Sequence, residues 1–251
     1  MKKLLELKDI SMKYQTQKDE ITAIKNLNME CGEGEFLSLI GPSGCGKTTV
    51  LSIIAGLIKP TGGEVLIDGM PIRKHSAELG YMLQKDQLFP WRTIEQNVFL
   101  PLEVKKMNDE EHKKYALSLL EKYGLKSFAK IYPDQLSGGM RQRAALIRTL
   151  APKPRLLLLD EPFSALDYQT RLAVCDDVYK IIKAENKTAV LVTHDISEAI
   201  SMSDIIVVLS DRPAKVKSIH RPKIAGTSPL RRRESPDFSG WFEKIWKELN
   251  R

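Results

Sequence analysis

A glycine-rich run at residues 41–48, Gly-Pro-Ser-Gly-Cys-Gly-Lys-Thr, is the segment of this sequence best suited to chemistry. It matches G-x-x-x-x-G-K-[ST], in which backbone N–H groups turn inward around an anion because glycines leave the approach open. We expect Lys47 to reach the β- and γ-phosphates of a nucleotide and the Thr48 hydroxyl to bind Mg²⁺. The residues predicted to line this phosphate loop are Gly41, Pro42, Ser43, Gly44, Cys45, Gly46, Lys47, Thr48 and Thr49.

Two adjacent carboxylates, Asp160 and Glu161, follow four leucines at residues 156–159. Such a run predicts a buried strand, and open α/β sheets bind their ligands at the carboxyl ends of strands. We expect Asp160 to hold Mg²⁺ through its water shell and Glu161 to polarise an attacking water. The alternative is a strand end whose acids only face solvent, and the nearby phosphate loop argues against it.

The elements that must position these groups are short apolar runs alternating with helical patterns, which predict an α/β fold with a mostly parallel sheet. The phosphate loop follows one apolar strand and opens a helix at 47–58, the context in which the motif is credible. Strands of nearly continuous apolar character, expected where both faces of a sheet are covered, are 36–40, 156–160, 189–193 and 205–209.

Two further regions complete the predicted fold. Residues 4–10 and 64–68 fit an antiparallel edge sheet, because they alternate in polarity or lie beside turn signals. A helical lobe at about 85–150 is inserted into the α/β core, with Asn108 as the N-cap of a helix over 109–123 that Gly124 ends. The whole chain, 1–251, is then one domain with a C-terminal tail at about 212–251.

Composition indicates a globular protein of the cytosol. Hydrophobic residues make up 42% and charged residues 28% of the chain, and no run approaches the roughly 18 apolar residues of a membrane-spanning helix. The basic start lacks the apolar core of a secretory signal. Three scattered cysteines without CxxC spacing indicate reduced thiols and no zinc site. The net charge of +7 leaves nucleic acid, anionic lipid and an acidic nucleotide open as partners.

The run at residues 136–143, Leu-Ser-Gly-Gly-Met-Arg-Gln-Arg, resembles the signature sequence of ABC-family ATPases, and it precedes a helical stretch at 141–150. Ser137 and the amides of Gly138 and Gly139 form a second anion site at that helix start. The resemblance covers essentially the whole chain and implies the P-loop NTPase core of that family. One departure is Met140, where many members carry Gln; it lies outside the phosphate contact and affects only the packing of the lobe.

Further motifs carry roles that the resemblance implies. Tyr14 is similar to the aromatic residue that stacks on adenine, and Gln84 to the glutamine that senses Mg²⁺ and links the site to the helical lobe. Asp167 ends a segment, 164–167, resembling the loop that couples two opposed sites, and His194 resembles the histidine that contacts the γ-phosphate. The family implies a head-to-tail homodimer in which the phosphate loop of one copy and Ser137 and Gly139 of the other enclose each ATP.

The chain most resembles the ATPase subunit of a bacterial importer. Gln84 and Ser137 are too close in sequence to leave room for the long coiled coils of the DNA-repair and chromosome-maintenance relatives. A single phosphate loop argues against the tandem-cassette translation factors. The absence of fused membrane spans from the sequence argues against most exporters built as one chain. The segment 89–91, Phe-Pro-Trp, resembles the nitrate/sulfonate/taurine group. That group implies a peripheral protein at the cytoplasmic face of the membrane, working with a multi-span permease and an extracytoplasmic solute-binding protein, without nucleic acid.

Two questions stay open at this point. A soluble ABC ATPase acting on nucleic acid or ribosomes, and the ATPase of an exporter, remain alternatives, and the transported solute does not follow from the sequence. Residues 89–91 are expected to dock a cytoplasmic helix of the permease, the alternative being packing inside the lobe. In the tail, a helix over 236–250 has one apolar face, formed by Phe238, Trp241, Phe242, Ile245, Trp246 and Leu249. Packing of this face on its own domain is favoured over a membrane or partner contact. Residues 231–233 are expected to be a solvated charge run.

Overall fold

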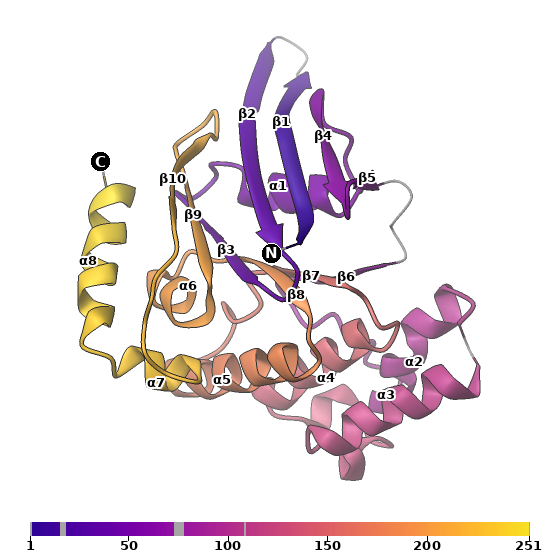
Figure 1. The fold of residues 1–251 in the computed structure, drawn as a ribbon. Coiled ribbons are helices and arrows are strands. Elements are labelled where there is room, and N and C mark those ends of the chain that lie inside the picture. The colour runs from indigo at the N-terminus through magenta and orange to yellow at the C-terminus, as the bar shows by residue number, and fades with distance from the viewer. Residues whose placement is uncertain (1, 16–18, 73–77, 108, 251) are drawn as a thin grey trace. The chain divides into compact units, whose positions relative to one another are not determined.

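The computed structural model describes residues 2–15, 19–72, 78–107 and 109–250, which fold into two compact units. One unit joins Met1–Ser76 to Asn186–Arg251, and the other is Ala77–Glu185. We refer to them as the phosphate-loop unit and the helical unit. Both combine helices with β-strands, in agreement with the predicted α/β class (Figure 1).

The phosphate-loop unit carries the predicted antiparallel sheet, with strand order β2-β1-β4-β5 (Figure 1). Its long strands β1 (Lys3–Gln15) and β2 (Glu20–Gly32) pair along most of their length, and β4 (Gly62–Ile67) lies on the other side of β1. The short β5 (Met70–Pro71) completes it. The sequence prediction of an antiparallel edge is confirmed.

The parallel strands of the same unit lie around β3 (Phe36–Ile40), which pairs with β8 (Thr188–Val192) on one side and β9 (Ile205–Leu209) on the other. Every residue of these three strands is buried, which explains their nearly continuous apolar sequence. The strand β10 (Val216–His220) adds an antiparallel edge beside β9. The phosphate loop leaves β3 at its carboxyl end and leads into α1 (Lys47–Ile54).

The helix α1 ends at Ile54, four positions before the predicted end at Ile58. Ala55 is its C-cap, and Gly56 follows with a φ of +72°, a left-handed conformation that stops helix propagation and that glycine adopts without strain. The predicted boundary was wrong because the apolar pattern continues through Leu57 and Ile58 after the helical backbone has turned away.

The C-terminal tail packs largely on its own unit, as expected. Its helices are α7 (Pro229–Arg233) and α8 (Asp237–Leu249), and Ile245 of α8 is buried against a cluster that includes residues of α6 (Ile196–Met202), β3 and β9. Phe238, Trp241 and Leu249 pack on the same cluster. The expectation was wrong at two positions of the apolar face, Phe242 and Trp246, which stay 38% and 51% exposed.

The predicted solvated charge run at residues 231–233 is only partly solvated. Arg231 is exposed and pairs with Glu234 at 2.8 Å. Arg232 is mostly buried, and its Nη1 donates to the Ser201 carbonyl at 3.2 Å, so it ties α7 to α6. The long apolar stem of an arginine can pack against neighbouring residues while its guanidinium donates to carbonyls. Arg232 therefore has a structural role.

The helical unit contains one parallel strand pair, β6 (Leu79–Met82) with β7 (Leu156–Asp160), and most of the helices. The helix α4 (Gly138–Leu150) packs on α2 (Ile94–Val104), α3 (Glu110–Lys122) and α5 (Tyr168–Ala184). Two single-turn 3₁₀ helices, η3 (Lys126–Phe128) and η4 (Pro133–Gln135), connect α3 to α4. Among the described helices, none is both long and apolar enough to cross a membrane.

The start of α3 differs from the prediction by one residue. The predicted cap, Asn108, lies outside the described residues, and Asp109 is the N-cap, whose carboxylate accepts the His112 backbone N–H at 3.0 Å. Aspartate is as good a cap as asparagine, so the composition alone did not separate the two. The predicted stop is confirmed, because Gly124 has a φ of +74°.

Candidate functional site

The phosphate loop has the geometry of an anion cradle. Gly46 is the N-cap of α1 with a φ of +124°, and no side chain caps the first turn of the helix, so its N–H groups face the loop. Gly41 leaves little room for a side chain, because a Cβ there would lie 3.0 Å from both Cys45 Sγ and Leu209 Cβ. The cradle therefore fits a phosphate group, which needs close backbone approach without side chains.

Lys47 is buried at the start of α1, where its Nζ donates to the carbonyl oxygens of Gly41 at 2.8 Å and Pro42 at 2.9 Å. These bonds hold the ammonium across the mouth of the loop, the place from which it can reach a phosphate. Burial raises the pKa of the neighbouring Cys45 thiol, so the thiol stays protonated as a small space-filling group, as expected.

Two other predicted residues belong to the same unit. Tyr14, on β1, is 38% exposed, and its hydroxyl lies 3.5 Å from Thr49 Oγ1 of α1, so its ring stands beside the phosphate-loop helix. His194 is exposed and lies in a turn after β8. Hydrogen bonds on both sides hold this turn: Thr193 Oγ1 donates to Glu198 at 2.6 Å. Asp195 caps α6 by accepting the backbone N–H groups of Ser197 and Glu198. The turn presents the imidazole from a rigid base.

One contact of the phosphate loop was not predicted. The Arg212 guanidinium donates through Nη2 to the Gly44 carbonyl at 2.6 Å. Arg212 follows β9 by three residues and is 168 positions from its acceptor. Nothing in the local sequence signals this contact, because it depends on the strand order around β3.

The predicted residues of the helical unit gather at the carboxyl ends of β6 and β7. The Gln84 Nε2 donates to Ser164 Oγ at 3.4 Å, and Ser164 Oγ donates to the Glu161 carbonyl at 3.0 Å. The Tyr81 hydroxyl donates to Asp160 Oδ2 at 3.4 Å, and the Asp160 side chain is buried. Gln84, Ser164 and the backbone of Glu161 are therefore linked within this unit, and the site roles of Gln84, Asp160 and Glu161 stay predictions.

Glu161 has a φ of +44°, in the left-handed region that side chains other than glycine rarely adopt. Such backbone costs about 1–3 kcal/mol and is found mainly where function demands a particular side-chain position. Within the helical unit, the amide oxygen of Gln84 and the carboxylate of Asp160 are hard donors, the chemistry that suits Mg²⁺.

The signature residues border a cavity of about 440 Å³ within the helical unit. Ser137 is the N-cap of α4, and its Oγ accepts the Met140 N–H at 3.4 Å. Across the cavity, Asp167 caps α5, and the hydroxyl and N–H of Thr170 hold the pKa of that carboxyl below its usual range. The buried Gln142 lies on the cavity wall, where its Oε1 has no hydrogen-bond partner among the described residues.

The two signature glycines differ in what their small size is used for. Gly138 lines the cavity, as expected for an amide that meets a ligand. Gly139 is buried, and a Cβ there would lie 2.8 Å from Val174 Cγ2, so this position needs glycine for the packing of α4 on α5. The close packing of α4 on α5 is thus a second reason for glycine at position 139, and the sequence pattern did not reveal this reason.

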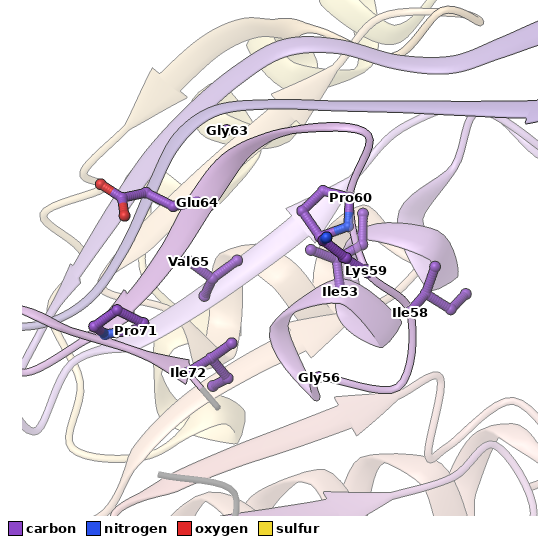
Figure 2. Close-up of a pocket in the computed structure, with 10 residues that line it drawn as sticks. All are labelled: Ile53, Gly56, Ile58, Lys59, Pro60, Gly63, Glu64, Val65, Pro71 and Ile72. Atoms are coloured by element: carbon purple, nitrogen blue, oxygen red, sulfur yellow. The ribbon is translucent and has the colours of Figure 1, made fainter. Parts of the chain in front are cut away.

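A separate apolar pocket of about 210 Å³ lies at the far end of α1 from Lys47 (Figure 2). The aliphatic side chains of Ile53, Val65 and Ile72 line it, together with the backbone at Gly56 (Figure 2). None of the predicted site residues borders this pocket, and its apolar walls do not suit a triphosphate.

Residues 24–164 match the ABC transporter family. The chain therefore belongs to this family: it is an ABC transporter ATP-binding subunit, an ATP hydrolase that binds ATP. The family assignment, the ABC ATPase fold and the enzyme class predicted from the sequence are confirmed. Since dimeric cassettes are among its structural relatives, the class is one that forms dimers.

Several relatives match most of the chain. The uncharacterised ABC transporter ATP-binding protein YtlC of Bacillus subtilis (strain 168) is 51% identical over 248 residues, 98% of this chain and 95% of YtlC. The aliphatic sulfonates import ATP-binding protein SsuB of the same strain is 40% identical over 230 residues, 92% of this chain and 88% of SsuB. A dimeric ATP-binding cassette solved in a post-hydrolysis state with ADP and Pi has a TM-score of 0.73 and 37% identity, covering 87% of this chain and 98% of the cassette.

Proposed function

We propose that this chain, as one ATPase domain over residues 1–251, energises an ABC importer through a separate membrane permease. The transported solute is a small molecule of the nitrate, sulfonate or taurine type, delivered by an extracytoplasmic solute-binding protein. Support for this class comes from the relatives named for aliphatic sulfonate import and from the segment at 89–91. The protein then works at the cytoplasmic face of the membrane without crossing it.

The single observation that carries the hydrolytic role is the phosphate cradle with its buried lysine. The backbone N–H groups of Gly41, of residues 43–46 and of the first turn of α1 bind the phosphates. Lys47 exchanges its two loop carbonyls for β- and γ-phosphate oxygens. Tyr14 stacks on adenine from its exposed position on β1. When Lys47 exchanges a loop carbonyl for a phosphate oxygen, its ammonium gains a charged acceptor in place of a neutral one, which favours the ATP-bound arrangement.

Glu161 acts as the general base that orients and polarises the attacking water, and His194 donates a hydrogen bond to the γ-phosphate. The strained φ of Glu161 fixes where its carboxylate points, since the chain bends sharply at that residue. Gln84, Asp160 and Thr48 are the residues that would hold Mg²⁺, directly or through water. When bound there, the ion would supply positive charge that offsets the negative charge of the phosphate oxygens.

A second copy completes each site. Two copies pair head to tail, so that Ser137, Gly138 and Gly139 of one meet the γ-phosphate of the ATP bound by the other. The cavity that Ser137 shares with Asp167 supports this arrangement, because it is open and lined by polar groups beside a helix N-terminus. Asp167 connects the two sites across the dimer. ATP binding closes the pair and hydrolysis opens it.

The permease contact is assigned to a pair of exposed aromatic side chains. Phe89 and Trp91 stack with ring centroids 5.0 Å apart, and Trp91 is 70% exposed. Large rigid aromatic side chains that are stacked but uncovered are the usual anchors of protein interfaces. The alternative, that these residues only fill the interior of the lobe, does not account for the exposure of Trp91.

The experiment is affinity purification of the Glu161→Gln variant with ATP from detergent-solubilised native cells, followed by mass spectrometry. We expect a multi-span permease to be recovered with it, and far less of it with the matched Lys47→Ala variant, which lacks the ammonium that binds phosphate. Recovery of ribosomes or nucleic-acid proteins without a membrane protein would overturn the importer assignment and leave the ATPase chemistry standing. A Trp91→Ala variant that recovers the permease normally would overturn the assigned contact.

A further inference from the structure

Two arginines of α4 connect the signature helix to the segment that carries the aromatic pair. Arg148 donates through Nη2 to the Asp86 carbonyl at 2.5 Å and through Nη1 to the Gln87 carbonyl at 2.6 Å. Arg141, seven positions earlier and on the same face of the helix, donates through Nε to Asp86 Oδ2 at 3.2 Å. We call residues 86–93 the aromatic segment. Its first residues are therefore bonded to α4 at two points.

Burying the Arg148 guanidinium is unfavourable unless its hydrogen bonds to the carbonyls of Asp86 and Gln87 are both made. Burial lowers the pKa of Arg148 from its ordinary value, and the Asp86 carboxylate opposes part of that effect. A partly desolvated guanidinium that loses its two carbonyl acceptors would be left with unmet donors. Gln87 also has a φ of +49°, so the backbone that offers these carbonyls is held in an unusual conformation. α4 and the start of the aromatic segment are thus expected to move together.

A second anchor holds the other end of the aromatic segment and comes from a different helix. Asn97 of α2 is fully buried, and its Oδ1 accepts the Phe89 N–H at 2.7 Å. Its Nδ2 donates to the carbonyls of Phe89, Arg92 and Thr93 at 3.0–3.1 Å. Asn97 therefore fixes the conformation of the segment, but α2 carries none of the residues assigned to ATP.

We propose that Arg148 is a positioning residue that transmits ATP engagement at Ser137 to the aromatic pair Phe89 and Trp91. The proposal rests on the proposed function, in which Ser137 meets the ATP of a second copy. Ser137 caps the first turn of α4, and Arg148 lies near its last turn, so one rigid helix carries both contacts. When the start of α4 moves, the Arg148 guanidinium at its other end moves with it and displaces the carbonyls of Asp86 and Gln87. Asn97 fixes the conformation of the aromatic segment, and Arg148 makes its position depend on nucleotide.

Hydrogen–deuterium exchange on the isolated full-length protein tests this. The reporters are the backbone N–H groups of Leu88, bonded to Asp86 Oδ1, and of Phe89, bonded to Asn97. In the Glu161→Gln background, adding MgATP is expected to change the exchange rate of these amides by about fivefold or more, the scale of ordinary coupling between sites. In Arg148→Lys and Arg148→Gln combined with Glu161→Gln, the rates with and without MgATP are expected to agree within about twofold.

Asn97→Ala is the matched control, since it removes an anchor of the same segment that is not connected to Ser137. It should speed exchange at Phe89 both with and without MgATP while preserving the ratio of the two rates. A merely structural role of Arg148 would give the same pattern as Asn97→Ala and would overturn the proposal. In the background with Glu161 intact, Arg148→Lys is expected to hydrolyse ATP within about twofold of the parent protein, because it touches neither phosphate nor water.

Dimer formation, followed by size-exclusion chromatography in the same samples, separates the possible failures. A parent that forms no ATP-dependent dimer would overturn the proposed head-to-tail arrangement and the coupling with it. A parent that dimerises with ATP while exchange at Leu88 and Phe89 stays constant would overturn the coupling alone. Thermal unfolding of each variant establishes that Arg148→Lys is folded, and its retained charge makes it the less disruptive of the two substitutions.

Discussion

The side chain of Asn97 offers the sharpest test of how the helical unit is held together. It is fully buried and makes four hydrogen bonds with backbone groups of residues 89–93, at 2.7, 3.1, 3.0 and 3.0 Å. Replacement by alanine removes all four and leaves the Phe89 N–H and the Arg92 carbonyl to find other partners, whereas the carbonyls of Phe89 and Thr93 still accept the backbone N–H groups of Arg92 and Asn97. Since a typical hydrogen bond contributes about 1 kcal/mol net, and a buried group left unpaired costs about 1–3 kcal/mol, we expect a loss of about 3–5 kcal/mol.

The loss would be measured as the change in free energy of unfolding in urea, monitored by circular dichroism. Asn250→Ala is the control, because this exposed asparagine makes a single hydrogen bond, to the Trp246 carbonyl, and should change stability by less than about 0.5 kcal/mol. Asn97→Asp should also be strongly destabilising, because a carboxylate cannot donate to three carbonyls. A loss below about 1 kcal/mol for Asn97→Ala would refute the reasoning, since water or the relaxed segment would then replace the bonds at little cost.

Three other outcomes concern the site and its support. Glu161→Gln should lower the rate of phosphate release by about 10²–10⁴-fold while ATP still binds, and normal turnover would remove Glu161 from the role of base. Lys47→Ala should weaken ATP binding by more than about tenfold in a nucleotide titration; unchanged affinity would contradict the cradle. Glu185, partly desolvated, nevertheless has a lowered pKa because it accepts hydrogen bonds from Lys122, Tyr123 and Tyr115. Its stabilising contribution is therefore fully present above the ordinary pKa of 4.5 and is lost as pH falls through the lowered pKa, so Glu185→Gln should cost more stability at pH 7 than at pH 3. An equal cost at both pH values, measured by urea unfolding, would contradict that assignment.

Features that depend on local pattern could be predicted from the sequence. The phosphate loop, the acids at the carboxyl end of β7 and the start of α4 at Ser137 each combine a motif with a neighbouring strand or helix, and the structure has them as expected. Continuous apolar runs identified β3, β7, β8 and β9, because strands covered on both faces have no polar alternation. Local signals suffice where a residue's role is set by its immediate neighbours in the chain.

Roles that depend on distant neighbours were missed. Arg148 lies in the predicted helical run at 141–150, where no local signal marks its contacts, yet it bonds to carbonyls 61 and 62 positions away. Arg212 gives no local signal for the same reason. The partners of Asn97 are only four to eight positions away, but no motif marks this residue in the sequence. In the tail, helical periodicity predicted which face of α8 is apolar but not how much of that face is buried, since Ile245 is buried and Trp246 is half exposed. Periodicity reports which side of an element is apolar, and only the tertiary packing decides how much of it is covered.

The left-handed backbone of Glu161 has a consequence for how this protein can be improved. A glycine at this position would adopt the observed φ of +44° without strain, releasing some of the roughly 1–3 kcal/mol stored there. The same change would delete the carboxylate assigned to the attacking water. A selection for thermostability alone would therefore favour an inert protein at residue 161, and any engineering campaign on this chain needs turnover as a second criterion at that position.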